Sequence, residues 1–385
     1  MKQGWEIKEL GEVYDVRDGT HDSPKYVENG YALITSKNLK NDNLNYDNVN
    51  FITEQDYINI NKRSKVDVGD VLFAMIGTIG NPIVIRDEPD FAIKNVALFK
   101  VPKNQDSYFL KYYLDSGQVI EQMTKDAKGA TQKFVGLGYL RNFKIPLPPL
   151  PEQQRIVAIL NEAFAAIAKA KANAQQNLKN VKELFESYLQ GVFENENWKT
   201  KTIDEVCNEI FAGGDAPKNN YSLEPNDKHN IPIYANAVKD RGLYGYTDFA
   251  RVTKPCVTIA ARGSGTRHTE LRNESFFPIV RLIVCIPDTN QMQTEFLKYT
   301  IDNLVIQRSG SAIPQLTIPM IKDYKIPTPS IEEQKKVIEK AETLKEQKEN
   351  LENVYLKKIE GLEELKKSVL QKAFSGELKT NVVAV

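Results

Sequence analysis

The sequence predicts an α+β protein in which two strand-rich domains alternate with two long helices, and in which the second half repeats the first. Three observations lead to this prediction. Lys144-Ile145-Pro146 recurs as Lys325-Ile326-Pro327. Short apolar runs broken by Gly, Pro and Asn precede each tripeptide, as in strands joined by turns. A long helical pattern follows each tripeptide.

The order of these features predicts five segments. The first strand-rich domain is expected over residues 1–149, with runs such as DVLFAMIG, and the second over residues 196–330, with runs such as VTIAARG. A central spacer helix is expected over residues 150–195 and a C-terminal one over residues 331–378. Residues 379–385 form a tail.

The composition excludes a general polyanion binder. The 385 residues carry 51 Lys+Arg and 51 Asp+Glu, so any nucleic-acid contact has to come from a local patch. The N-terminus lacks the apolar segment of a signal peptide, and no apolar run approaches the roughly 20 residues that span a membrane. Three cysteines without CxxC spacing predict neither a disulfide framework nor a zinc site. We expect a cytoplasmic protein without a membrane segment or bound metal.

The repeat is strictest in the helices. Glu152-Gln153 matches Glu333-Gln334, and Leu189-Gln190 matches Leu370-Gln371, at one constant offset. Upstream the offset drifts, because FLKYYLDS in the first half matches FLKYTIDN in the second at a different spacing. The helices have therefore kept their length, whereas the domains have diverged in their loops.

Apolar residues in both helices recur at alternating spacings of four and three, which is the period of a coiled coil. Prolines precede each helix, Ser330 and Glu333 form a capping box at the start of the second, and Gly376 is a stop signal. The predicted coiled-coil seam comprises Ile156, Leu160, Ile167, Val181, Leu184, Tyr188, Val337, Leu344, Leu351, Tyr355, Leu362, Leu365 and Val369.

The two helices are predicted to pair with each other in antiparallel orientation. This alignment places Ala163 against Leu362 and Ala174 against Leu351, so that small residues face large ones. A parallel alignment matches sizes equally well. The connection favours the antiparallel one, because the chain passes through a whole domain between the helices and the two halves are then related by a pseudo-twofold axis.

Two Gly-rich turns are the sharpest candidates for DNA binding. Glycine lets a backbone approach a phosphate closely, and Arg side chains can bind guanine or phosphate. The alternative is an ordinary pair of β-turns, and the residues alone leave both open. The candidates are Gly77, Thr78, Gly80 and Asn81 in the first domain, and Arg262, Ser264, Thr266, Arg267 and His268 in the second.

Other polar residues are weaker candidates for the same role. The TSKNLK segment offers Lys37 and Asn38 to a major groove, unless it is a solvated loop. Lys218 in GGDAPK is available to a phosphate, unless the segment is only a tight turn. Lys94 and Asn236 complete the set. Asn236 lies near tyrosines, which are also common as half-buried strand residues.

No catalytic motif is complete. The sequence has no Gly-rich methyl-donor motif and no phosphate-binding loop. Asp288, Glu295 and Lys298 approach a nuclease pattern, but the last step is E-x-x-K where nucleases use E-x-K. We therefore expect a non-catalytic chain, and the nuclease reading predicts metal-dependent cleavage by the purified protein.

KIPLPPLPEQQRIVAIL and KIPTPSIEEQKKVIEKA resemble the segment that ends a target-recognition domain in specificity subunits of type I restriction-modification systems. VLQKAFSGEL resembles the end of the spacer helix in this family, and GYALITSKNL and GDVLFAMIGTIGN resemble first-domain motifs. The resemblance covers nearly the whole chain. GATQKFVGLGYL departs from the family pattern, and GSAIPQLTIPMI is closer to it.

The resemblance implies a sequence-specific subunit that recognises a bipartite, asymmetric site in double-stranded DNA. It implies two methyltransferase subunits and restriction subunits as partners, with S-adenosylmethionine, ATP and Mg on those partners and no cofactor on this chain. Spacer helices suit such a role, because half-sites recur about 34 Å apart per helical turn of DNA. The alternative function is a coiled-coil adaptor that binds protein partners through its end domains.

Overall fold

The computed structural model describes residues 4–194, 197–262, 265–304 and 316–378. The protein is α+β, and its contacts divide it into two compact units. The first unit comprises the chain up to Gln175 and from Leu356 onward, and the second comprises Gln176–Tyr355. Each unit holds one strand-rich domain and about half of each long helix.

The first domain contains a four-stranded sheet in the order β2-β10-β7-β8 and a three-stranded sheet in the order β6-β3-β9, with two further pairs, β1-β11 and β4-β5. Strand β3 is parallel to β9 and antiparallel to β6. The strands are β1 Glu6–Glu9, β2 Asp15–Asp18, β3 Tyr31–Ile34, β4 Leu39–Lys40, β5 Asn43–Leu44, β6 Asn50–Ile52, β7 Val71–Ala74, β8 Gly80–Val84, β9 Phe91–Ile93, β10 Val96–Lys100 and β11 Lys144–Leu147.

Both faces of the four-stranded sheet are buried at its central strands β7 and β10, which explains why these two strands are continuous apolar runs. In β7, Phe73 packs into one cluster with Phe99, whereas Leu72 packs into another with Leu98. Short helices cover the sheets. They are α1 Leu10–Val13, η1 Ser36–Asn38, α2 Glu54–Ser64, α3 Ser107–Leu114, α4 Gly117–Asp126 and α5 Leu137–Asn142.

The second domain has the same strand order as the first. Its sheets are β13-β19-β16-β17, β15-β14-β18 and β12-β20, and β14 is parallel to β18 as β3 is to β9. The strands are β12 Thr200–Thr202, β13 Cys207–Ala212, β14 Ile231–Tyr234, β15 Leu243–Thr247, β16 Cys256–Ile259, β17 Thr269–Arg272, β18 Phe277–Pro278, β19 Ile283–Pro287 and β20 Lys325–Pro327. The short helices are α7 Ile203–Val206, η2 Lys239–Gly242, α8 Thr294–Asn303 and α9 Ile318–Lys322.

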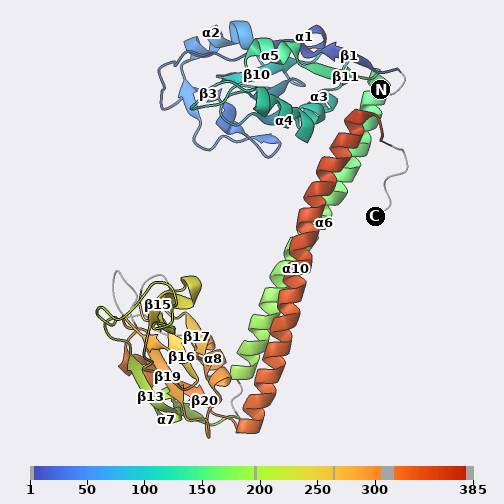
Figure 1. Ribbon diagram of the computed structural model, residues 1–385. Helices are drawn as coiled ribbons and strands as arrows, with labels where there is room; N and C mark the ends of the chain where they lie inside the picture. Colours follow the sequence, from blue (N-terminus) through green and yellow to red (C-terminus); the bar gives the residue numbers. More distant parts are fainter. Residues whose placement is uncertain (1–3, 195–196, 263–264, 305–315, 379–385) are drawn as a thin grey trace. The chain divides into compact units, whose positions relative to one another are not determined.

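The long helices α6 (Leu150–Phe193) and α10 (Ile331–Ser375) run side by side (Figure 1). In the first unit Lys366 lies over the ring of Phe164, and in the second Lys348 lies over the ring of Phe185. The order of these contacts confirms the antiparallel pairing. The predicted cap is also confirmed, because the Glu333 carboxylate accepts from the Ser330 N–H at 3.0 Å. Gly376 follows α10 with a φ of 79°, as the stop signal requires.

The predicted register between the helices is wrong by more than a helical turn. Ala163 was expected opposite Leu362, but its neighbour Phe164 lies under Lys366 instead. The reason lies at the helix ends, where packing into a domain fixes the register. Phe374 of α10 lies 5.3 Å, between ring centroids, from both Phe109 and Tyr113 of the first domain.

The seam prediction is wrong at three leucines, which are exposed. The exposed fraction is 69% for Leu184, 43% for Leu351 and 42% for Leu365. After Ala174 the inward face of α6 advances by four residues rather than three, to Leu178, and Phe185 then takes the place of Leu184. A straight helix drifts in this way from a strict heptad repeat. The other seam residues are buried or half-buried, namely Ile156, Leu160, Ile167, Val181, Tyr188, Val337, Leu344, Tyr355, Leu362 and Val369.

Candidate nucleic-acid interface

The first domain carries a polar hollow of about 450 Å³ that brings together several predicted DNA-binding residues. Lys37, Lys40 and Lys94 line it, and Asp47 is the one carboxylate in its lining. This balance of charge attracts a polyanion, although the chain as a whole is neutral. The full lining is Tyr26, Leu33, Thr35, Ser36, Lys37, Asn38, Lys40, Asp47, Asn48, Asn50, Ile76, Lys94, Asn95 and Gln132.

Asn38 forms part of the wall, but its amide is already used within the protein. Its Oδ1 accepts from the N–H and the hydroxyl of Thr35, both at 2.9 Å, and its Nδ2 donates to the Asn45 carbonyl at 2.9 Å. The side chain is 5% exposed. The prediction that Asn38 reads a base in the major groove is therefore corrected. Asn38 holds the turn that presents the exposed neighbours Lys37 and Lys40.

Lys94 enters the hollow from the end of β9. Its Nζ donates to the Ser23 hydroxyl at 2.6 Å, and its backbone N–H donates to the Ile34 carbonyl at 2.8 Å. The next residue, Asn95, has a φ of 54°, and its Oδ1 lies 2.8 Å from His21 Nδ1. Lys94 is thus half-buried and held in place, with its charge at the wall of the hollow.

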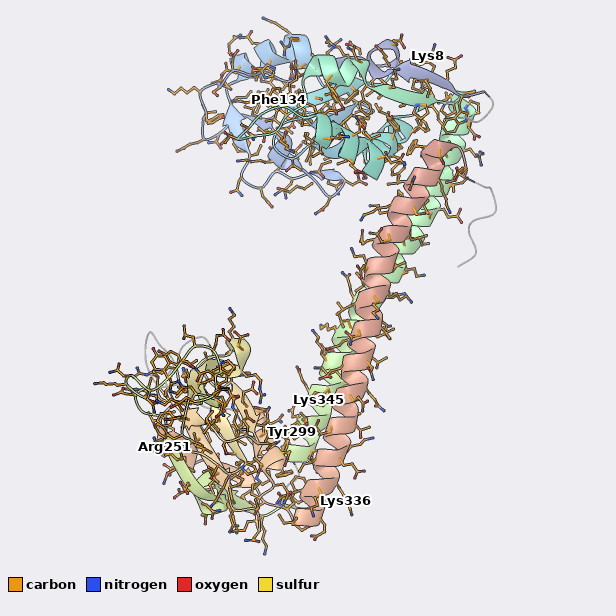
Figure 2. The ribbon with its side chains drawn as sticks, in the orientation of Figure 1. Lys8, Phe134, Arg251, Tyr299, Lys336 and Lys345 are labelled. Carbon is orange, nitrogen blue, oxygen red and sulfur yellow. The ribbon has the colours of Figure 1, made fainter. Side chains whose placement is uncertain are left out.

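The glycine turn of the first domain lies beside a second loop that the sequence analysis did not include. Gly77 has a φ of 78°, and its N–H donates to the Lys133 carbonyl at 2.9 Å. A Cβ on Gly77 would lie 3.1 Å from Gln132 Nε2, so the turn needs glycine for both conformation and space. Phe134 of this loop bridges to Ile76 and is labelled in Figure 2.

The four residues predicted in this turn lie beside the hollow and do not line it. Gly77, Thr78 and Asn81 are exposed, whereas Gly80 is buried against Ile120, and none of the four lines the hollow. Gln132 lines it instead. Its segment had been set aside because it departs from the family pattern, and no periodicity in the sequence marks it.

In the second domain Asn236 supports the loop that carries Arg262. Its Oδ1 accepts from the N–H groups of Ala261 and Arg262, and its Nδ2 donates to the Arg262 carbonyl at 2.9 Å. The carbonyl oxygen of this amide and one of its two N–H donors therefore hold the loop, and the predicted base contact has only the second N–H donor left to it. The side chain of Arg262 is exposed, while its backbone is held by Asn236.

Other predicted residues of this loop are engaged with the domain. Arg267 has a φ of 82° and donates from Nη2 to the Leu304 carbonyl at 2.7 Å. His268 Nε2 lies 2.9 Å from Glu270 Oε1, and Thr266 is 5% exposed. These positions correct the prediction that Thr266, Arg267 and His268 face DNA. Ser264 lies outside the described residues, and Lys218 is exposed.

A network of charged residues braces the second domain behind this loop. Arg272, 1% exposed, stacks its guanidinium 3.6 Å from the ring centroid of Tyr234 and donates to the Arg241 carbonyl. Arg241 Nε donates to Glu270 Oε2 at 3.0 Å. Burial acts to raise the pKa of Glu270, but hydrogen bonds from Arg241 and His268 outweigh it and hold this pKa below its ordinary value.

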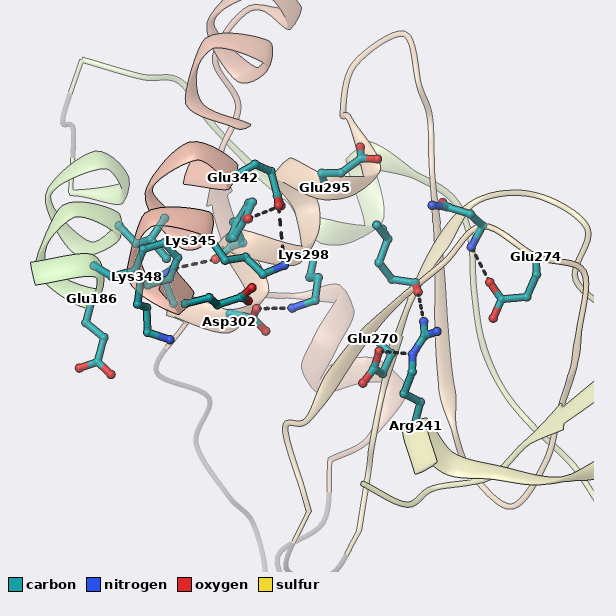
Figure 3. Close-up of a pocket in the computed structure, with 17 residues that line it drawn as sticks. Glu186, Arg241, Glu270, Glu274, Glu295, Lys298, Asp302, Glu342, Lys345 and Lys348 are labelled. Carbon is teal, nitrogen blue, oxygen red and sulfur yellow. Dashed lines mark hydrogen bonds and ion pairs between the residues drawn. The ribbon is translucent and has the colours of Figure 1, made fainter. Parts of the chain in front are cut away.

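Part of this network lines a cleft of about 660 Å³ in the second unit (Figure 3). The cleft lies between β17, α8 and the adjoining turns of α6 and α10. Acidic side chains outnumber basic ones in its lining, so its field opposes DNA. Its ionisable residues are Glu186, Arg241, Glu270, Glu274, Glu295, Lys298, Asp302, Glu342, Lys345, Lys348 and Glu349.

The nuclease pattern is not assembled. Asp288 accepts from Asn290 and Gln291, and Lys298 pairs with Asp302 at 2.7 Å on α8. Within the part of the chain that the structure describes, no group of three or more His, Cys, Asp or Glu residues could hold a metal ion. No described helix is long and apolar enough to cross a membrane.

Comparison with known proteins gives this geometry its context. The family model described as the type I restriction modification DNA specificity domain matches residues 2–179 and 195–361. The chain belongs to this family. As a type I specificity subunit it is the non-catalytic DNA specificity subunit that directs methylation and restriction.

Relatives match the specificity subunit over its whole length or over part of it. It is similar to the putative type I restriction enzyme MjaX specificity subunit of Methanocaldococcus jannaschii, with 21% identity over 98% of this chain and 95% of the relative. It also resembles the type I restriction enzyme EcoBI specificity subunit of Escherichia coli, with 27% identity over 39% of this chain and 33% of the relative.

Solved structures share the fold of the specificity subunit. The HsdS subunit from Thermoanaerobacter tengcongensis superimposes with a TM-score of 0.66 and 20% identity, covering 98% of both chains. A chain solved in work on complex assembly and conformational transition of the type I R-M system gives a TM-score of 0.78 and 21% identity, covering 98% of this chain and 99% of that one.

Proposed function

We propose that this specificity subunit recognises a bipartite, asymmetric site in double-stranded DNA, with one half read by each domain. The polar hollow of the first domain is the observation that carries the proposal. It places the charges of Lys37, Lys40 and Lys94 beside the amide of Gln132. Lysine can bind phosphate or guanine, and glutamine can pair with adenine, so the hollow offers both positioning and reading groups.

The second domain reads the other half from a different set of groups. Arg262 and Lys218 are its exposed candidates, and Asn236 holds the backbone around Arg262. Since the two domains share strand order but present different side chains, the two half-sites are expected to differ in sequence. A chain whose two recognition domains present different side chains is expected to bind an asymmetric DNA site.

The spacing between half-sites is set by the paired helices. Inserting one matched heptad into both α6 and α10, after Gln175 and after Leu356, keeps the inward faces in phase and lengthens each helix by about 10 Å. We expect the methylated motif to gain about three base pairs of unread spacer, at 3.4 Å per base pair. Methylome sequencing of cells that express the complex measures this, and an unchanged spacer would contradict the role of the helices.

The partners are methyltransferase subunits, two per chain, together with restriction subunits that bind through the complex. The cofactors S-adenosylmethionine, ATP and Mg would be bound by those subunits. Exposed apolar side chains on the helices of the second unit, Leu184, Leu351 and Val354, support a partner that packs helices there. Replacing Leu184 and Leu351 with Glu is expected to abolish copurification with the methyltransferase, and intact copurification would contradict this surface.

The hollow is tested by its salt dependence. In the complex with its methyltransferase, Lys37→Ala with Lys40→Ala is expected to reduce the slope of log binding constant against log salt by about 2, since each phosphate contact contributes about 0.9. Lys103→Ala, an exposed lysine outside the hollow, is the matched control. If the slope were unchanged in the double variant, the hollow would not be part of the DNA-binding interface.

The adaptor alternative makes the opposite prediction. If the domains bound proteins rather than DNA, the complex would show no sequence-dependent methylation at all, whichever lysines were replaced. A methylated split motif in the wild type excludes that alternative.

A further inference from the structure

A buried glutamine lies in the first turn of each long helix. Gln153 in α6 and Gln334 in α10 are both 0% exposed. Glutamine is seldom fully buried, because its amide must then find partners within the protein. The two residues occupy equivalent positions in the repeat, and no role in DNA binding or partner binding has been given to them above.

Gln153 joins three segments of the first unit. Its Oε1 accepts from the backbone N–H of Asp106 at 3.0 Å. Its Nε2 donates to the carbonyl of Pro148 at 2.8 Å and to Gln105 Oε1 at 2.7 Å. Both donors and the acceptor of the amide are therefore used. Asp106 is the N-cap of α3, and Pro148 lies between the end of β11 and the start of α6.

Gln334 makes the same connections in the second unit. Its Oε1 accepts from the N–H of Gln293 at 2.8 Å, and Gln293 is the N-cap of α8. Its Nε2 donates to the carbonyls of Pro329 at 3.0 Å and Gln291 at 2.8 Å. The one difference is that a backbone carbonyl of Gln291 replaces the side chain of Gln105.

A second bond follows about two turns further along each helix. The hydroxyl of Tyr112 donates to Asn161 Oδ1 at 2.5 Å in the first unit, and that of Tyr299 donates to Glu342 in the second. Figure 2 labels Tyr299 on the side of its domain that adjoins α10. Each domain is thus bound to its outgoing helix at two levels. Rotation about the proline segment would break the glutamine bonds and leave buried polar groups without partners.

We propose that Gln153 and Gln334 are positioning residues that fix the orientation of each recognition domain on its outgoing helix, and so set which half-site spacing the complex accepts. This inference rests on the proposed function, because spacing has a meaning only if each domain reads one half-site. The glutamines act through the domain and touch no DNA. Losing one lets the domain tilt, so that neighbouring spacings become acceptable.

The test compares methylation rates on DNA duplexes that differ only in spacer length. The complex with the methyltransferase is assayed on the native spacer and on spacers one base pair shorter and longer. With Gln153→Leu or Gln334→Leu, we expect discrimination against the wrong spacers to fall about two- to tenfold, the factor that one net hydrogen bond is worth. Gln154→Leu and Gln347→Leu, on the exposed faces of the same helices, are the matched controls.

A milder variant guards against loss of folding. Gln105→Leu removes one of the three bonds of Gln153 and leaves the backbone bonds in place. It is expected to reduce discrimination less than Gln153→Leu. In the same variants, spin labels on exposed Glu88 and Ala168 report the orientation of the first domain on α6, and their distance distribution is expected to broaden.

The outcomes are distinguishable. If the wild-type complex itself shows no spacer preference, the proposed function fails and this inference fails with it. If the wild type discriminates and the glutamine variants discriminate equally well, with an unchanged label distribution, the glutamines serve packing only and the inference is overturned. Relaxed discrimination together with a broadened distribution supports it.

Discussion

The two domains are nearly identical where they meet the long helices and different where they face away from them. Gln153 and Gln334 make equivalent hydrogen bonds, and β1 pairs with β11 in the same register as β12 with β20. Thr35 and its neighbours in the first domain instead form a turn around Asn38, whereas the second domain holds its loop through Asn236. The shared part joins each domain to its helix, and the unshared part is where the proposed DNA-binding residues lie.

The two domains also differ in how they use the side chains that were predicted to bind DNA. In the first domain, lysines in short turns line the hollow. In the second domain Arg267 and His268 bond to Leu304 and Glu270, so these side chains support the loop. Basic side chains therefore line a hollow in one domain and support a loop in the other.

The largest expected effect comes from repeat-equivalent leucines. Leu370 lies in the core of the first domain, and Leu189 packs with Tyr299 of the second. We expect Leu370→Ala and Leu189→Ala each to cost about 2–4 kcal/mol, because a buried leucine is lost. Hydrogen exchange should show the loss in the first domain for Leu370→Ala and in the second for Leu189→Ala. Exposed Gln371→Ala is the control, and equal loss in both domains would contradict two separate units.

A smaller effect is expected from the two asparagines that hold recognition loops. Asn38→Ala and Asn236→Ala each leave backbone groups without partners, at a cost of about 1–3 kcal/mol. Asn38→Ala should speed proteolysis at residues 36–45, and Asn236→Ala should speed it at Arg262, whose backbone loses its hydrogen bonds to the Asn236 side chain. The exposed Asn104→Ala serves as the control. Protease resistance equal to wild type in both variants would show that the loops are held by other contacts.

The smallest effect concerns pH and belongs to the second domain. The pKa of Glu270 is held below its ordinary value of 4.5 in the folded protein. Its contribution to stability is therefore present above pH 4.5 and is lost as the pH falls through the lower folded-state pKa. In Glu270→Gln, the fall in thermal stability of the second domain on acidification below pH 4.5 should be shallower than in wild type. Glu346→Gln, exposed on α10, should leave the wild-type slope unchanged.

The sequence allowed much of the architecture to be predicted. Repetition at constant offset identified the helices, and the capping residues Ser330 and Glu333 and the stop at Gly376 lie where they were expected. The register between helices was not predictable from the seam, because it is fixed by Phe374 and Phe193 packing into the domains. Heptad counting carries no information about that long-range packing.

The candidate site was predictable only in part. Three predicted residues, Lys37, Asn38 and Lys94, line the hollow, whereas the glycine turn does not. An amide such as that of Asn38 or Asn236 looks the same in a sequence whether it faces solvent or its own backbone. Gln132 enters the hollow because its loop pairs with Ile76, which lies far from it in the chain. Such a contact has no local signal.

The end of α10 completes the core of the first domain, and this has a consequence for biosynthesis. Leu370 and Ala373 are buried there beside Ile156 and Leu160, which the ribosome makes far earlier. At about 5–20 residues per second, the interval between these segments is on the order of 10–40 s. The core of the first domain is therefore incomplete until the last turns of α10 have been synthesised. Until then an apolar face of this domain is exposed to solvent. A chain that is truncated before Leu370 leaves the apolar face of its first domain exposed. Premature termination near the C-terminus therefore destabilises the N-terminal domain.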